Sequence, residues 1–162
     1  MKSAIKYQLL LLCCASLGAT AFAREWQPPG EFLKAIRFVE SSNGANQVGD
    51  NGDSLGEFQL SEAAWLDVND WRQARGLKTY PYDGTVFHSY ISRVYASNYL
   101  TILHGELSRR LRRPPNHGEI YAAYNLGLAS FAQCNYSLRR VNPVTRARCE
   151  QISNILAGKE SS

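Results

Sequence analysis

The chain has 162 residues, of which 44% are hydrophobic, and its formal net charge at neutral pH is +4. This length supports one domain with a single hydrophobic core and argues against two full-sized domains. The small net charge alone says little about partners, but acidic residues outnumber basic ones over residues 24–92, whereas residues 93–148 hold nine arginines against two acids. A protein with this bipolar charge could lay its basic side on an anionic polymer such as a cell wall.

The first 23 residues have the features of a cleaved export signal. Lys2 and Lys6 precede an apolar run over residues 7–17, and Ala21-Phe22-Ala23 fits the small-x-small rule for signal peptidase. The apolar run, at roughly 11 residues, is too short for a membrane span, which needs about 20. We therefore expect residues 1–23 to be removed.

Cleavage would leave residues 24–162 as one exported domain, periplasmic or secreted and free of the membrane. A lipid anchor at Cys13 or Cys14 is the weaker alternative, because Leu12 and Cys13 precede these cysteines where a small residue would be expected. We expect the domain to be a monomer.

Helix signals dominate this domain, and strand signals are sparse. The first predicted helix begins near Glu31, and its apolar residues recur at spacings of three and four. They are Phe32, Leu33, Ile36 and Val39. The glycine-rich segment from Gly44 to Gly56 should form a loop or a small hairpin.

Two further helices follow, each after a residue that can cap it. We expect Ser61 to cap a helix that holds Trp65 and Trp71, and Thr85 to cap a longer helix whose apolar stripe runs to Ile102. Both assignments rest on the apolar spacing of the residues behind the cap.

Three more helical segments complete the chain. A shorter basic helix is predicted over Glu106–Arg113, stopped by Pro114-Pro115. Residues Ile120–Leu126 read as a helix that ends at Gly127, and Asn142-Pro143 should begin a last helix through Leu156. The sequence therefore predicts a mainly α fold with a short glycine-rich loop or small hairpin.

Glu40 lies on the apolar face of the first predicted helix. It follows Ile36 by four residues and Leu33 by seven, so it should project along the buried stripe. Desolvation there should raise its pKa and let it keep a proton near neutral pH. A neutral carboxylic acid in a cleft could protonate a glycosidic oxygen. The alternative is a glutamate that reaches solvent or pairs with Arg37.

Three short motifs occur in a particular order: Glu40-Ser41, Gly56-Glu57-Phe58-Gln59 and Ala123-Tyr124-Asn125-Leu126-Gly127. This order resembles the lysozyme-like superfamily, in particular the catalytic domain of soluble lytic transglycosylases and goose-type lysozymes. The resemblance covers residues 40–60 and 122–127 clearly. It implies a lysozyme-like α+β domain with a catalytic cleft beside the glycine-rich loop.

By this resemblance, the chain is an exported enzyme that cuts the β-1,4 bond between MurNAc and GlcNAc in peptidoglycan strands without a cofactor. Glu40 would act first as general acid and then as base, drawing the proton from the substrate's own 6-hydroxyl to form an anhydro sugar. Two alternatives remain, namely a hydrolytic lysozyme and a wall-binding protein that kept the fold and lost turnover.

The resemblance also implies roles around the cleft. Ser41 would orient the acid by a hydroxyl hydrogen bond, Gly56 would let backbone approach the sugar, and Gln59 would place a polar side chain there. Tyr124 would place a phenol near the catalytic carboxyl, and Asn125 an amide that supports the cleft. The simpler alternatives are a helix-end serine, a turn glycine, a glutamine that holds loop backbone, a core tyrosine and a helix-end cap.

The choice between lyase and hydrolase falls on Asp50. The loop around it resembles that of goose-type lysozymes, where an aspartate can position the hydrolytic water. An inverting hydrolase needs a second carboxylate roughly 6.5–9.5 Å from the acid, and Asp50 or Asp53 could supply it. Both could equally be ordinary turn residues.

Glu57 departs from the family pattern, which usually has apolar residues between the glycine and the glutamine. If it points inward it would raise the pKa of Glu40 by like-charge repulsion; the sequence favours a side chain that points to solvent.

Other sites are less distinctive. A disulfide between Cys134 and Cys149, favoured by export, would close a loop of about 15 residues and contribute roughly 3 kcal/mol, the alternative being two free thiols. The arginine cluster at residues 109, 110, 112 and 113 could attract wall anions but reads more readily as a solvated face. We expect no metal site and no nucleic-acid partner.

Overall fold

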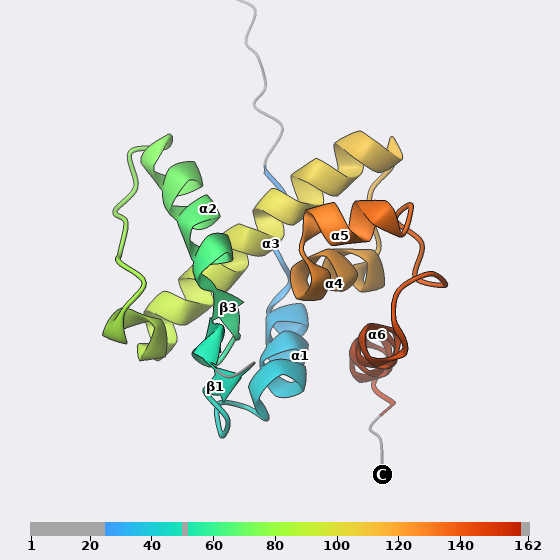
Figure 1. Ribbon diagram of the computed structural model, residues 1–162, viewed down its shortest axis with the longest axis horizontal. Coiled ribbons are helices and arrows are strands. Elements are labelled where there is room, and N and C mark those ends of the chain that lie inside the picture. The colour runs from blue at the N-terminus through green and yellow to red at the C-terminus, as the bar shows by residue number, and fades with distance from the viewer. Residues whose placement is uncertain (1–24, 50–51, 160–162) are drawn as a thin grey trace, which may run out of the picture.

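The computed structural model describes residues 25–49 and 52–159 (Figure 1). The predicted signal at residues 1–23, with the candidate anchors Cys13 and Cys14, lies outside the described residues, and so does Asp50. No helix in the described part of the chain is long and apolar enough to cross a membrane.

Helices make up most of the described chain, and a small antiparallel sheet accompanies them. The helices are α1 (Gly30–Ser41), α2 (Glu62–Gln73), α3 (Ser89–Leu111), α4 (His117–Leu126), α5 (Leu128–Gln133) and α6 (Pro143–Leu156), with a 3-10 turn η2 (Gly84–Phe87). The sheet has the order β1-β2-β3, formed by β1 (Val48–Gly49), β2 (Ser54–Leu55) and β3 (Leu60–Ser61). The predicted mainly α class with a small hairpin is confirmed.

Helix α1 buries the apolar stripe that its sequence predicts and carries Glu40 to its last turn. Phe32 and Ile36 are fully buried, and they anchor the helix in the core. The helix ends where Ser42 adopts a left-handed conformation with φ of 50°. The chain then turns directly into the loop that leads to β1, so Glu40 lies beside the small sheet.

Helix α3 corrects two boundaries that the sequence suggests. Thr85 does not cap it, because the Thr85 hydroxyl donates to the Pro81 carbonyl at 2.7 Å and the Asp83 side chain accepts from the Thr85 amide, which starts η2 instead. The long helix begins at Ser89 and runs unbroken to Leu111. Residues 106–111 of the separate basic helix predicted over Glu106–Arg113 are therefore its last part, and Arg112 ends it in a left-handed conformation with φ of 57°.

Helix α4 is buried along most of its length. It begins at His117, three residues before the predicted start, because Asn116 and Glu119 form a capping box in which each side chain accepts from the other residue's amide. It packs against α6 on one side and α3 on another. After Gly127 the chain forms the short helix α5, which the sequence did not predict.

The expected disulfide between Cys134 and Cys149 is not formed, and both thiols are free. The Cys149 thiol is buried on α6 and lies 3.5 Å from the Gly118 carbonyl of α4. The Cys134 thiol lies 3.5 Å from the carbonyl of Arg140, in the segment after α5. The two thiols therefore contact different parts of the chain. Burial raises the pKa of Cys149 to about 11, so this thiol stays protonated.

Candidate active site

A cleft of about 400 Å³ lies where the end of α1, the small sheet, α4 and α6 meet. Its walls include Glu40 from α1, Gln59 next to β3, Tyr99 from α3, and Arg148 from α6. Glu40 is the only carboxylate among the described residues that line it. The cleft thus joins the helical part of the fold to the glycine-rich loop, as the sequence led us to expect.

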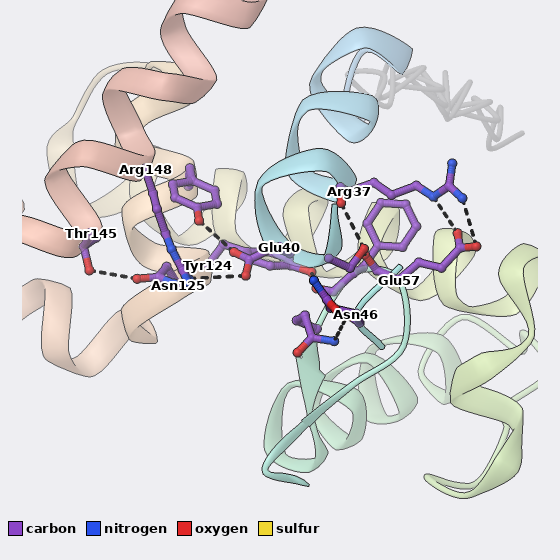
Figure 2. Close-up of polar contacts among 12 residues, drawn as sticks. Arg37, Glu40, Asn46, Glu57, Tyr124, Asn125, Thr145 and Arg148 are labelled. Atoms are coloured by element: carbon purple, nitrogen blue, oxygen red, sulfur yellow. Dashed lines mark hydrogen bonds and ion pairs between the residues drawn. The ribbon is translucent and has the colours of Figure 1, made fainter. Parts of the chain in front are cut away.

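The Glu40 carboxyl group is almost completely buried, with its side chain 6% exposed. The Tyr121 hydroxyl donates a hydrogen bond of 2.7 Å to Glu40 Oε1, and Arg148 Nη1 lies 3.5 Å from Oε2 (Figure 2). Burial favours the protonated acid, whereas a donated hydrogen bond and a nearby guanidinium favour the carboxylate. Burial and these two contacts therefore favour opposite protonation states of the Glu40 carboxyl group.

Within the described part of the chain, Tyr121 and Arg148 are contacts of Glu40 that sequence reasoning missed. Tyr121 precedes Tyr124 by three positions, so both lie on one face of α4, and this spacing could have identified it. Arg148 lies on α6, outside every motif, and only the tertiary packing brings it to Glu40. Burial, followed by the charge of Glu40, raises the pKa of Tyr121 well above its usual value, so its hydroxyl keeps its proton and remains a donor.

Tyr124 lines the cleft, but its hydroxyl contacts backbone. It donates to the Phe58 carbonyl at 2.5 Å and so ties α4 to the Gly56–Gln59 motif. Burial, followed by the charge of Glu40, raises its pKa well above the usual value. The phenol that directly contacts the carboxyl group is Tyr121, one helical turn earlier.

Asn125 lies in the cleft wall at the end of α4, where its side-chain oxygen accepts a hydrogen bond of 2.8 Å from the Thr145 hydroxyl (Figure 2). Thr145 is buried in the first turn of α6. This bond fixes α6, and with it Arg148, relative to α4. Asn125 therefore supports the cleft wall.

Ser41 positions the end of α1 instead of contacting the acid directly. Its buried hydroxyl lies 2.7 Å from the Glu57 carbonyl and 3.0 Å from the Arg37 carbonyl, and it accepts from the Gly44 amide. These contacts hold the last turn of α1 against the loop that follows. The expected orientation of Glu40 by Ser41 is thus indirect.

Gly56 is a packing position. Its φ is +79°, and a Cβ atom there would lie 2.4 Å from the Val86 carbonyl oxygen, so only glycine lets the loop pack against η2. Gly56 is buried and is not among the described residues that line the cleft. The backbone approach that the resemblance assigned to a sugar is here an approach to another backbone segment.

Gln59 lines the cleft and also holds the loop. Its amide nitrogen lies 2.8 Å from the Gly56 carbonyl. It also lies 3.3 Å from the Asn46 carbonyl (Figure 2). The residue itself has a positive φ of 48°. The alternative that Gln59 holds loop backbone therefore describes its contacts, although the side chain still faces the cleft.

Glu57 points neither into the cleft nor to solvent. Its carboxylate lies 2.8 Å from Arg37 Nε and 3.1 Å from a second guanidinium nitrogen (Figure 2). It also accepts a hydrogen bond from the Ser89 hydroxyl. Arg37 is thus the partner of Glu57 and not of Glu40. This ion pair, together with the Ser89 contact, joins α1, the loop and the start of α3.

Other sequence candidates lie away from the cleft. Asp53 is exposed and does not line it, and Asp50 is not described, so the water-positioning role stays a prediction. In the arginine cluster, Arg109 contacts Glu106 and Arg113 pairs with Glu119, which offsets part of its charge. The described residues contain no group of three His, Cys, Asp or Glu that could hold a metal ion.

No family model matches the chain, and neither does any curated protein or solved structure. What points to a function is therefore the three short motifs and the geometry of the cleft.

Proposed function

We propose that this chain is an exported lytic transglycosylase, which cuts the β-1,4 bond between MurNAc and GlcNAc of peptidoglycan with Glu40 as its single acid and base. The observation that supports this most directly is the buried carboxyl group of Glu40 in a cleft of about 400 Å³, contacted by the Tyr121 hydroxyl and near the Arg148 guanidinium. A buried, hydrogen-bonded carboxyl group in a cleft is suited to proton transfer.

The proposed reaction needs one carboxyl group in two roles. Protonated Glu40 gives its proton to the glycosidic oxygen as the bond from MurNAc C1 to that oxygen breaks. The resulting carboxylate takes the proton of the MurNAc 6-hydroxyl while that oxygen bonds to C1 and closes the anhydro ring. No water is consumed, and Glu40 ends the cycle protonated.

The surroundings of Glu40 suit this alternation. Burial favours the acid form that starts the reaction, whereas the Tyr121 hydrogen bond and the Arg148 charge favour the carboxylate that forms midway. A group that must be acid and base in turn works best when neither form is strongly preferred. We therefore assign Tyr121 and Arg148 as residues that position and balance Glu40.

Product analysis of digested cell wall tests the proposal. Purified peptidoglycan should yield anhydro-muramyl products, each lighter by one water than the hydrolytic product, as read by mass spectrometry. Glu40→Gln should lower the rate by at least about a hundredfold, because it removes the proton donor. Glu31→Gln, an exposed change on the same helix, should keep full activity. Equal rates for Glu40→Gln and the parent, or no cleavage by either, would refute the proposal.

A hydrolytic lysozyme is the second candidate. The observation in its favour is that Gly49, the residue before Asp50 in the chain, lines the cleft. Hydrolysis would release a reducing end, and Asp50→Asn would then abolish turnover. If the products are anhydro sugars and Asp50→Asn still forms them, this second candidate is excluded.

A further inference from the structure

A second groove, of about 570 Å³, continues from the candidate active site. It lies between α2 and the start of α5, with α3 beneath it, and Figure 1 shows α2 and α5 on opposite sides of α3. The groove and the cleft share Ser61, Ala64, Tyr99, Leu126 and Gly127 as lining residues. A molecule seated over Glu40 could therefore extend into the groove without leaving the surface.

The groove combines apolar walls with uncompensated negative charge. Ile102 and Leu103 contribute from α3, Trp71 from α2, and the carboxylates of Asp67 and Asp70 stand on the same face of α2. Neither aspartate forms an ion pair with a described lysine or arginine.

The pKa of Asp67 is consistent with uncompensated negative charge on α2. Burial, followed by the charge of Asp70, raises the pKa of Asp67. The third acid of the groove, Glu106, differs because Arg109 and Arg110 contact it. The uncompensated charge is thus concentrated on α2, and a cation there would relieve the repulsion between the two aspartates.

This chemistry selects among the parts of a peptidoglycan strand. A strand without stem peptides carries a free lactyl carboxylate on each MurNAc, which two aspartates would repel. A strand with stem peptides has that carboxylate tied up in an amide bond and carries primary amines on aliphatic side chains. Such a side chain could lie along Ile102 and Leu103 and bring its ammonium group to Asp67 and Asp70.

We propose that this groove binds the amine-bearing stem peptide of the strand whose glycan occupies the cleft. The proposal rests on the proposed function, and it adds that the enzyme favours peptide-bearing strands with free amines. The contact is an exposed charge pair, so its effect should be modest and should weaken as salt rises.

Cleavage kinetics on two matched strands test the groove. One strand carries stem peptides with free amines, and the other is the same material after acetylation of those amines. We expect the parent to have a KM about threefold to fivefold lower for the free-amine strand, the factor of one partly exposed charge pair. The double variant Asp67→Asn/Asp70→Asn should have the same KM for the two strands. The control Glu31→Gln/Glu150→Gln removes two exposed carboxylates elsewhere and should keep the preference.

These outcomes distinguish a failure of the groove proposal from a failure of the proposed function. Cleavage of both strands by the parent with equal KM would overturn the groove proposal and leave the proposed function standing. If the parent cleaves neither strand, calorimetric binding of a soluble disaccharide with its stem peptide decides. Binding that requires the free amine and is lost in Asp67→Asn/Asp70→Asn would support the groove proposal even though the proposed reaction had failed. Equal binding with and without the free amine, or no binding, would overturn the groove proposal.

Discussion

Glu40 has contacts on both carboxyl oxygens, and each comes from a different helix. Tyr121 of α4 contacts Oε1, and Arg148 of α6 lies near Oε2. Because both partners favour the carboxylate while burial opposes it, changing either partner should alter the proposed reaction without removing the proposed catalytic group itself. The two partners act differently, since the first is a hydrogen-bond donor and the second is a charge.

Tyr121→Phe should lower kcat by about tenfold, the value of one hydrogen bond to a charged group, and should change KM little. The reason is that the phenol contacts the carboxyl group and does not line the cleft. Steady-state kinetics on soluble glycan strands measure the effect. Tyr124→Phe provides the contrast, because its hydroxyl contacts the Phe58 carbonyl, so it should mainly lower the free energy of unfolding. An unchanged kcat for Tyr121→Phe would show that this contact does not assist catalysis.

Arg148→Gln should move the alkaline limb of the pH profile of kcat/KM to higher pH by about half to one pH unit. Removing the guanidinium takes away a charge that favours the carboxylate, so Glu40 keeps its proton to higher pH. Arg148→Lys should restore part of the original profile. Arg93→Gln removes an exposed positive charge that does not line the cleft and should leave the limb in place. An identical profile for Arg148→Gln would contradict the assigned role.

The sequence located part of this site and not the rest, for identifiable reasons. Glu40 could be placed in a buried position from its spacing to Ile36, because helix periodicity relates residues on one element. Its contact with Arg148 depends on how α6 packs against α1, which local spacing does not encode. Ser41 and Gly56 were located by their motifs, but their contacts are with backbone that tertiary structure brings near.

At the scale of elements, helix α1 and the loop behave as one unit because Arg37 and Glu57 join them. Arg37 lies on α1, Glu57 lies just before β3, and Ser89 at the start of α3 adds a third contact. The Ser41 hydroxyl holds the same junction from the backbone side. The position of Glu40 relative to the sheet therefore depends on this junction.

Glu57→Gln should destabilise the fold by about 1–2 kcal/mol, less than a fully buried pair would cost, because the Arg37 side chain is 36% exposed. Urea unfolding followed by circular dichroism measures the change. The double variant Arg37→Met/Glu57→Leu should recover part of the loss, since it leaves no unpaired charge in the half-buried site. Additive losses in the double variant would mean that the two residues do not stabilise each other.

The starts of helices were predictable where the side chain of the capping residue accepts a hydrogen bond from a backbone amide of the helix. Ser61 accepts from the Ala64 amide and Asn142 from the Thr145 amide, as their sequence positions suggested. The prediction that Thr85 caps the long helix was wrong because the side chain of Asp83, two residues earlier, accepts a hydrogen bond from the Thr85 amide. The short helix α5 carries no long apolar repeat, so periodicity could not distinguish it from a loop.

At the scale of the whole molecule, some of the charges that are unevenly distributed along the sequence line the cleft or the groove, and others pair within the fold. The acidic part of the chain includes α2, which supplies Asp67 and Asp70 to the groove. The basic part supplies Arg148 to the cleft but uses Arg113 to bind Glu119 within the fold. Charge counts along the sequence therefore predicted a bipolar molecule but not which charges remain available to a substrate.

The stability of the whole domain should fall in two stages as the pH decreases. Burial lowers the pKa of both His104 and His117 below the ordinary value of 6.5. The unfolded chain then takes up protons before the folded chain does, so stability decreases as the pH falls through 6.5. The second stage belongs to Glu119, whose pKa is lowered first of all by its hydrogen bond from Arg113. The unfolded carboxylate is protonated near 4.5, and this contribution is lost as the pH falls further.

Thermal unfolding across this pH range can separate the two stages. His104→Gln/His117→Gln should flatten the decline in the melting temperature between about pH 7 and pH 5, because the titrating groups are gone. Glu119→Gln should lower the melting temperature at neutral pH and flatten only the decline below about pH 4.5, since its carboxylate is what the acid protonates there. The two variants thus act on different parts of one curve. Parallel curves for the parent and both variants would mean that other groups control the acid sensitivity of the fold.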